Sequence, residues 1–379
     1  MNNISTTPRI LVVAGTRPEV VKLAPVVLEL RRRASAERIV LCSTGQHREM
    51  LATALSVFDL KADVDLDLMK ANQTLSGLTG DLFHGLDSVV RAQQPDWIVC
   101  QGDTTTAMVA SMVGFYHRIK VGHVEAGLRT YNRWQPFPEE INRRITDLVA
   151  DKHFAPTEES AANLRREGTP EDSIVVTGNT SIDAVHWIAD RPYDWSAGPL
   201  AAIPMDKPLV LITLHRRENF GGPMEGVLRA IRKLADDWRP QGAQFVFPVH
   251  LNPNVRSAVA KLLPSNSNVH LLEPIDYRSM IHAMKRATLI LTDSGGVQEE
   301  APSFGVPVLV LRETTERPEG VAAGASKLIG TDGERLLAEA NAVLSAPDRR
   351  RRLNPVNPYG DGRASERIAD VLLAGPTAQ

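Results

Sequence analysis

The chain has 379 residues, a formal net charge of −2 and 43% hydrophobic residues. This length exceeds one typical hydrophobic core, so we expect two domains, and the lack of a long basic run argues against a nucleic-acid partner. Cys42 and Cys100 stand in apolar runs and are expected to be buried, reduced thiols. We find no signal-peptide pattern and no apolar run of membrane-spanning length, so a cytoplasmic protein without a membrane partner is predicted.

The chain opens with an apolar strand at 9–14, a turn at 15–19 and a helix to about residue 33. Pro18 suits the first helical position, and Gly15 suits the turn before it. Arg17 stands at the mouth of this turn and Lys22 lies one turn into the helix, so both could contact an anion. A capped helix with a solvated arginine is the alternative.

Apolar runs and amphipathic runs then alternate through the first half of the chain. The predicted strands lie near 38–43, 96–100, 121–124, 152–155 and 174–177, and the predicted helices near 47–58, 75–93, 104–117, 139–150, 158–167 and from 180. Asp63, Asp65 and Asp67 resemble a metal-binding D-x-D pattern. Their period of two favours instead the wet face of an edge strand.

Four residues in this alternation could transfer protons. Asp103 and Glu125 follow predicted strands, Glu139 opens a helix after a long loop, and His215 follows the first strand of the second half. Such groups can accept or donate a proton near neutral pH when their surroundings tune them. Each also has a structural alternative: a helix cap for Asp103, a pair with Arg129 for Glu125, a helix start for Glu139 and packing for His215.

The composition divides the chain into four segments. Residues 1–190 form the first predicted domain, and 191–207, rich in Pro, Gly and Ala, are predicted to be a linker. Residues 208–356 form the second domain, with strands near 208–213, 244–248, 268–272, 287–292, 306–311 and 326–329. Residues 357–379 contain a turn and a last helix. Helices between strands throughout predict two doubly wound α/β domains, Rossmann-like, facing a central cleft, with ligands at the carboxyl ends of the strands.

A glycine-rich turn in the second half is the strongest candidate for a ligand site. Ser294, Gly295 and Gly296 follow a buried apolar strand and precede a predicted helix, where backbone N–H groups can approach a phosphate. Glu300 lies about one turn further on and could accept from the hydroxyls of a ribose. Arg317, after the next strand, could reach the same anion. The pattern predicts a pocket for a nucleoside diphosphate, and an ordinary βα turn is the alternative.

Eleven stretches in order along the chain resemble the non-hydrolysing UDP-N-acetylglucosamine 2-epimerases. They are GTRPE (15–19), GQHREML (45–51), GDTTT (102–106), GHVEAGLRT (122–130), PEEINRR (138–144), TGNTSID (177–183), HRREN (215–219), PVHLNPNVR (248–256), TDSGGVQEEAPS (292–303), RETTERPE (312–319) and NPYGDG (357–362).

The resemblance implies reversible interconversion of UDP-GlcNAc and UDP-ManNAc, an isomerase reaction. UDP leaves by anti elimination, a 2-acetamidoglucal forms, and UDP adds back with protonation of C2 on the other face. The resemblance also implies no nicotinamide and no metal, a GT-B type fold whose C-terminal helix packs back on the first domain, a homodimer, and supply of precursors for surface polysaccharides.

Carried onto this sequence, the resemblance assigns two groups of residues. The catalytic group is Asp103, Glu125, Glu139 and His215; the substrate-binding group is Arg17, Lys22, Arg143, Ile275, Met280, Ser294, Gly295, Gly296, Glu300 and Arg317. Which carboxylate acts on which face of the sugar is left open.

The sequence departs from the family pattern in two places. Ile275 and Met280 replace a Gln and a Phe near the uracil. At a second, activating UDP-GlcNAc site of bacterial members, Gln46 matches, whereas Glu49 and Asn72 replace a Gln and an Arg. Activation by substrate is therefore an open question.

Three other functions fit parts of this pattern. A glycosyltransferase of the same fold would use a UDP-sugar donor but would need an acceptor site. A hydrolysing epimerase would release ManNAc and UDP. A catalytically silent UDP-sugar sensor would have no use for Asp103, Glu125, Glu139 and His215.

Overall fold

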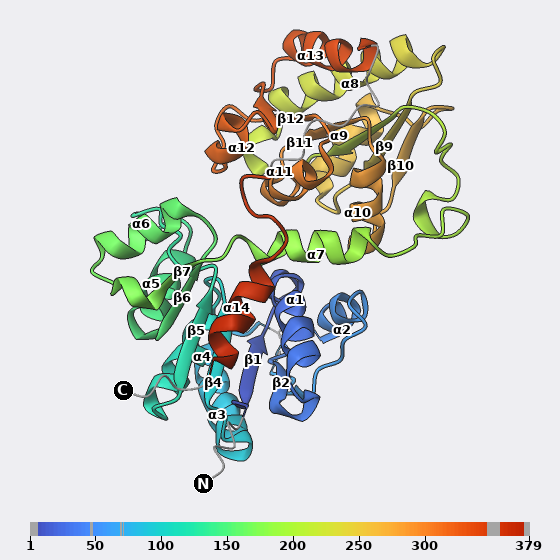
Figure 1. Cartoon of the computed structure of the whole chain (residues 1–379). Coiled ribbons are helices and arrows are strands. Elements are labelled where there is room, and N and C mark those ends of the chain that lie inside the picture. The colour runs from blue at the N-terminus through green and yellow to red at the C-terminus, as the bar shows by residue number, and fades with distance from the viewer. Residues whose placement is uncertain (1–6, 46–47, 69, 71, 347–356, 375–379) are drawn as a thin grey trace. The chain divides into compact units, whose positions relative to one another are not determined.

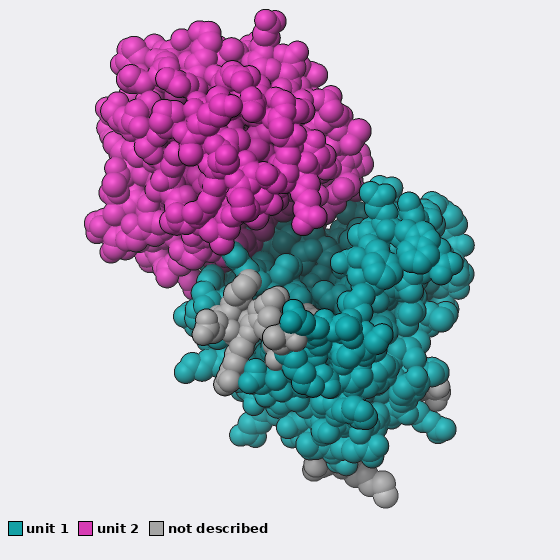
Figure 2. Space-filling view, turned by 180° about the vertical axis from the view of Figure 1, so that it is seen from behind, with its two compact units in different colours: residues 1–187, 360–379 teal, residues 188–359 magenta. Residues whose placement is uncertain are grey.

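The computed structural model describes residues 7–45, 48–68, 70, 72–346 and 357–374 (Figure 1). The chain forms two compact units, coloured separately in Figure 2. Unit 1 comprises residues 1–187 and 360–379, and unit 2 comprises residues 188–359. Residues 191–207, predicted as a linker, fall within unit 2 in this division.

Unit 1 is built on a seven-stranded sheet in which all neighbouring strands run parallel, in the order β3-β2-β1-β4-β5-β6-β7. The strands are β1 (Ile10–Ala14), β2 (Ile39–Ser43), β3 (Val64–Asp65), β4 (Trp97–Gln101), β5 (Lys120–Val124), β6 (Lys152–Ala155) and β7 (Ile174–Val176). The central strands β1, β2 and β4 are largely apolar and fully buried, which fits strands that helices cover on both faces.

Helices cover both faces of this sheet (Figure 1). The helices of unit 1 are α1 (Arg17–Arg33), α2 (Arg48–Ser56), α3 (Leu75–Gln93), α4 (Thr105–Tyr116), α5 (Glu139–Val149), α6 (Glu158–Arg166) and α14 (Ala364–Leu373). Helix α7 (Thr180–Ala189) crosses from unit 1 into unit 2 at Ile188. Helix α1 packs beside α2 and α14, and α4 packs beside α3 and α5. Leu11 and Val13, alternate residues of β1, join the core cluster under α3 and α4, as the period of two in a strand requires.

The last helix, α14, belongs to unit 1 although 172 residues of unit 2 precede it. Asp183 of α7 accepts hydrogen bonds from the backbone N–H groups of Ala364, at 3.2 Å, and Ser365, at 2.7 Å. This carboxylate supplies acceptors to N–H groups that have no partner inside the helix. Ile368 and Leu372 are fully buried, so both capping and apolar packing fix α14 to unit 1.

Unit 2 contains a six-stranded parallel sheet in the order β10-β9-β8-β11-β12-β13. The strands are β8 (Leu209–Thr213), β9 (Gln244–Pro248), β10 (Val269–Leu272), β11 (Leu289–Thr292), β12 (Val308–Val310) and β13 (Ser326–Leu328). The helices are α8 (Gly222–Trp238), α9 (Pro253–Leu262), α10 (Tyr277–Arg286), α11 (Gly295–Glu300), α12 (Pro318–Ala322) and α13 (Gly333–Ser345).

The predicted fold class, doubly wound α/β in two parts, is confirmed. In each sheet the strand order reverses between two central neighbours, β1 and β4 in unit 1 and β8 and β11 in unit 2. Ligands of such folds bind beyond the carboxyl ends of the strands at this reversal. None of the described helices combines the length and apolar character needed to cross a bilayer.

Candidate active site

Asp103 stands just beyond the carboxyl end of β4, and its carboxylate forms an ion pair with Arg143 of α5. Asn142 Nδ2 donates to the carbonyl oxygen of Asp103 at 3.0 Å, which fixes the backbone of the loop. The cap of α4 is Thr104, whose Oγ1 accepts from the N–H of Ala107 at 3.1 Å. The capping role considered for Asp103 therefore belongs to Thr104, and the Asp103 carboxylate is turned toward a cation.

Glu125 occupies the equivalent place beyond β5. Its carboxylate accepts from Lys22 of α1 and from Gln101 at the end of β4. The backbone of Glu125 adopts φ 66°, a left-handed conformation that is uncommon outside glycine and is often found at functional positions. Arg129, the alternative partner considered for Glu125, forms its ion pairs elsewhere.

Glu139 and Arg17 lie at the starts of helices. Glu139 is the first residue of α5, and its Oε2 is buried with no hydrogen-bond partner among the described residues. A buried carboxylate oxygen without a donor is costly, so such an atom suggests a group that a ligand or a proton satisfies. Arg17 is the first residue of α1 and is exposed, and its contact to an anion stays a prediction.

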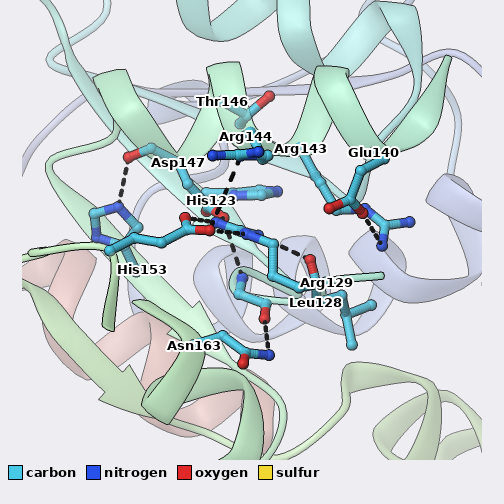
Figure 3. Close-up of polar contacts among 12 residues, drawn as sticks. His123, Leu128, Arg129, Glu140, Arg143, Arg144, Thr146, Asp147, His153 and Asn163 are labelled. Atoms are coloured by element: carbon cyan, nitrogen blue, oxygen red, sulfur yellow. Dashed lines mark hydrogen bonds and ion pairs between the residues drawn. The ribbon is translucent and has the colours of Figure 1, made fainter. Parts of the chain in front are cut away.

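A buried network of charges lies beneath these loops (Figure 3). At its centre Asp147 of α5 pairs with His123 of β5 at 2.5 Å and with Arg129 at 2.7 Å. Arg129 continues to Glu167 at 2.7 Å, and His153 Nε2 lies 2.8 Å from the carbonyl oxygen of Asp147. Burial alone raises the pKa of Asp147, but the charges of His123 and Arg129 and the His123 hydrogen bond hold it at about 2. The network joins β5, β6 and α5 to the loop after β5.

In unit 2, His215 lies in the loop that follows β8. A fully buried carboxylate, Asp293, fixes this loop by accepting from the N–H groups of His215 and Arg216 at 3.0 Å and from Asn219 Nδ2 at 3.2 Å. His215 Nδ1 also lies 3.5 Å from Asp293 Oδ1, and its ring stacks on His250 with centroids 5.5 Å apart. Burial lowers the pKa of His215 even though Asp293 raises it, so the imidazole is biased toward its neutral form.

The glycine-rich turn lies beside two arginines. Ser294 precedes α11, which begins at Gly295, two residues earlier than predicted. A Cβ added to Gly295 would lie 3.3 Å from Arg216 Nη2 and 4.0 Å from Arg317 Nη2, so both guanidinium groups lie next to this backbone. Arg317 is held by an ion pair with Glu299. Gly296 is exposed, which leaves its backbone accessible.

The predicted ribose and uracil residues lie around the start of α10. Tyr277 donates its hydroxyl proton to Glu300 Oε1 at 2.8 Å, which links α10 to the end of α11. Ile275 precedes this helix and Met280 lies within its first turn, and both are partly buried. Ile275 and Met280 thus lie on either side of Tyr277 in the sequence, and Tyr277 orients Glu300.

Four residues that the sequence analysis did not single out help to build these sites: Arg216, His250, Tyr277 and Asp293. Arg216 and His250 lie inside the family-like stretches HRREN and PVHLNPNVR, so the signal for them was present. Asp293 directly precedes the predicted Ser294. Of the residues considered for an activating site, Gln46 and the side chain of Glu49 lie outside the described residues.

The D-x-D pattern lies at the edge of the unit 1 sheet. Asp63 pairs with Arg31, and Asp65 accepts from Ser43 Oγ at 3.1 Å. Among the described residues, no three His, Cys, Asp or Glu side chains are grouped as ligands of a metal ion.

The protein is thus an α/β protein with one candidate site in each unit. Unit 1 has carboxylates that pair with cations, and unit 2 has a glycine-rich turn with an arginine on each side. Residues 29–373 match the family model described as UDP-N-acetylglucosamine 2-epimerase, and the chain belongs to this family.

Individual relatives are similar over nearly the whole chain. The UDP-N-acetylglucosamine 2-epimerase of Bacillus subtilis (strain 168) is 48% identical over 366 residues, which are 96% of this chain and 95% of that protein. A solved structure described as UDP-N-acetylglucosamine 2-epimerase has a TM-score of 0.87 at 45% identity, covering 97% of this chain and 95% of its own. The structure of the Neisseria meningitidis enzyme bound to UDP-GlcNAc has a TM-score of 0.81 at 44% identity, with 96% and 99% covered.

Proposed function

We propose that the protein interconverts UDP-GlcNAc and UDP-ManNAc without hydrolysing either. A base removes the proton at C2, the C1–O bond to UDP breaks with its electron pair leaving on UDP, and a C1–C2 double bond forms. UDP then adds back to C1, and an acid returns a proton to C2 from the other face. Every atom lost in the first half is regained in the second, so no co-reactant is required. The family membership over residues 29–373 carries this proposal.

We assign the proton transfers to the carboxylates of unit 1. Asp103 and Glu125 each pair with a cation, Arg143 and Lys22, which holds each carboxylate in a defined position beyond its strand. Glu139 has a buried Oε2 without a partner among the described residues, so this oxygen is available to a proton or a hydroxyl group of the sugar. Three carboxylates suit a reaction that must remove and return protons on opposite faces of one carbon.

We assign the departing UDP to unit 2. Negative charge develops on the diphosphate as the C1–O bond breaks, and preorganised cations stabilise such charge. Arg216 and Arg317 flank Gly295, and His215 stands at the end of the neighbouring strand β8. Glu300, oriented by Tyr277, is assigned to the ribose, and Ile275 and Met280 to the surroundings of the uracil.

The wider setting of the enzyme follows from the same assignment. We propose a cytoplasmic homodimer that supplies UDP-ManNAc for polysaccharide biosynthesis, with neither a metal nor a nicotinamide in the reaction. Family membership supports this setting, and sedimentation analysis of the purified protein tests the dimer.

The experiment is incubation of the protein with UDP-GlcNAc alone, followed by proton and phosphorus NMR. We expect a stable mixture of UDP-GlcNAc and UDP-ManNAc, which is reached equally from either nucleotide sugar. Accumulation of free ManNAc and UDP would instead identify a hydrolysing enzyme. An unchanged UDP-GlcNAc spectrum that changes only when a sugar acceptor is added would identify a glycosyltransferase.

A further inference from the structure

The imidazole of His123 is fully buried in unit 1 and has a partner at each nitrogen. Nδ1 lies 2.5 Å from Asp147 Oδ1, and Nε2 lies 2.8 Å from the carbonyl oxygen of Gly102. Figure 3 shows His123 reaching toward Asp147 within the network. Gly102 directly precedes Asp103, so this histidine holds the backbone that carries one of the proposed acid–base groups.

Both partners of His123 are hydrogen-bond acceptors. A carbonyl oxygen has no proton to give, and an ionised carboxylate has none either. A neutral imidazole carries one N–H and could satisfy only one of these partners. Asp147 itself accepts from Arg129 and, at 3.2 Å, from the N–H of Gly127, which are contacts that an ionised carboxylate makes. The proton count therefore requires N–H groups at both nitrogens of His123.

The charges around His123 agree with this count. Going outward from the ring, Asp147 is negative, Arg129 is positive and Glu167 is negative. Arg144 Nε also lies 3.9 Å from Glu167 Oε1, so Glu167 has two cationic partners, Arg129 and Arg144. A charged imidazolium gives the buried Asp147 carboxylate a second cation beside Arg129. Uncompensated buried charge is strongly unfavourable.

Two further titratable groups face this region. His153 of β6 contacts the backbone carbonyl of Asp147, and burial lowers its pKa, so it adds no positive charge at neutral pH. The thiol of Cys100 on β4 is buried, and burial raises its pKa, so it adds no negative charge. Neither His153 nor Cys100 therefore adds a charge beside His123.

We propose that His123 carries N–H groups at both ring nitrogens and is a positioning residue, which fixes the Asp103 loop by donating to the Gly102 carbonyl. Two other contacts hold the same loop, the Gly102 N–H to the Val124 carbonyl and Asn142 to the Asp103 carbonyl, both at 3.0 Å. Along the chain, the contact of His123 with the Gly102 carbonyl lies between these two. The effect of His123 on turnover rests on the proposed function. The protonation of His123 and its effect on the loop do not.

The protonation is tested by NMR of the whole protein labelled with ¹⁵N at histidine, at pH 7 to 8. The His123 signals are assigned as those lost in His123→Gln. We expect cross-peaks from two ring N–H groups of His123 throughout this range, and from only one in Asp147→Asn, where the compensating charge is gone. A single ring N–H in the wild-type protein overturns the proposal.

The positioning role is tested by comparing His123→Gln with His117→Gln. The control removes another histidine–aspartate contact of the same unit, His117 Nε2 to Asp87 Oδ1 at 2.6 Å, which lies between α3 and the end of α4. For His123→Gln we expect faster amide exchange at residues 102–104, a fall in kcat of at least about tenfold because the acid–base group is misplaced, and unchanged UDP affinity. The control should change none of these.

A folded His123→Gln protein with wild-type kcat and wild-type exchange at 102–104 overturns the positioning role. If the wild-type protein does not epimerise UDP-GlcNAc, the proposed function fails instead. The count of ring N–H groups and the amide exchange then still decide the proposal about His123.

Discussion

The two units place opposite kinds of charge at the carboxyl ends of similar parallel sheets. In unit 1 the residues beyond β4 and β5 are carboxylates, Asp103 and Glu125, and each pairs with a cation from a helix. In unit 2 the groups beside the turn after β11 are cations, Arg216 and Arg317. Under the proposed function, the same topology serves proton transfer in one unit and binding of an anion in the other.

The buried charges beneath these loops differ in the same way. Unit 2 fixes its His215 loop with one carboxylate, Asp293, that accepts mostly from backbone N–H groups. Unit 1 fixes its loops with several charged side chains. They are the network around Asp147 and the buried Glu19. Burial raises the pKa of Glu19 to about 7, so we expect the stability of unit 1 to change with pH near neutrality.

The largest effect is expected from the carboxylates of unit 1. Asp103→Asn, Glu125→Gln and Glu139→Gln each keep the size of the side chain and remove its capacity for proton transfer, so each should lower kcat by at least about 10²-fold. UDP affinity, measured by calorimetry, should persist because the nucleotide is assigned to unit 2. Glu159→Gln, an exposed residue of α6, is the control. Near-normal turnover in one variant would remove that residue from the catalytic group.

The next effect concerns stability and pH through Glu19. Burial raises the pKa of Glu19 to about 7, in spite of hydrogen bonds from Thr16, Thr104 and Gly15 that lower it. A raised folded-state pKa contributes stability that is complete below about 4.5 and is lost as the pH rises to about 7, by roughly 3 kcal/mol in total.

Glu19→Gln should remove this loss. We expect the free energy of unfolding of the variant, measured with urea between pH 4.5 and 8, to fall less with rising pH than that of the wild type. Equal slopes in the two proteins would show that Glu19 does not titrate in this window.

In unit 2, Arg216→Ala should weaken UDP binding by roughly ten- to a hundredfold, because a hydrogen bond to a charged group contributes about 1.5–3 kcal/mol. Arg217→Ala is the matched control, since Arg217 is the next residue of the same loop and is exposed. Calorimetric affinities that fall equally in both variants would point to a general charge effect and contradict the assignment.

Glu300→Ala should weaken UDP binding by a similar factor, with little change in turnover of bound substrate. Tyr277→Phe should have a smaller effect, about two- to tenfold, because it removes one neutral donor that orients Glu300. Calorimetry with UDP measures both. Unchanged affinity in Glu300→Ala would refute its placement at the ribose.

The fold could be predicted well because buried parallel strands read as continuous apolar runs, for example ILVVA at 10–14 and LILT at 289–292. The candidate positions after these strands followed from the same pattern. The ion-pair and hydrogen-bond partners of these candidate residues could not be predicted, because they are distant in sequence. Lys22, predicted to contact the substrate, pairs with Glu125, 103 residues away, and the bond between Tyr277 and Glu300 spans 23 residues. Such contacts depend on strand order, which local pattern does not specify.

The central claim is that unit 1 removes and returns the C2 proton while UDP departs. The most direct measurement is the conversion of UDP-GlcNAc in deuterated water, with the C2 position of the product read by NMR and mass spectrometry. We predict that UDP-ManNAc carries deuterium at C2 from the earliest time points. Product that retains the original hydrogen at C2 would contradict the exchange with solvent that these carboxylates are proposed to perform.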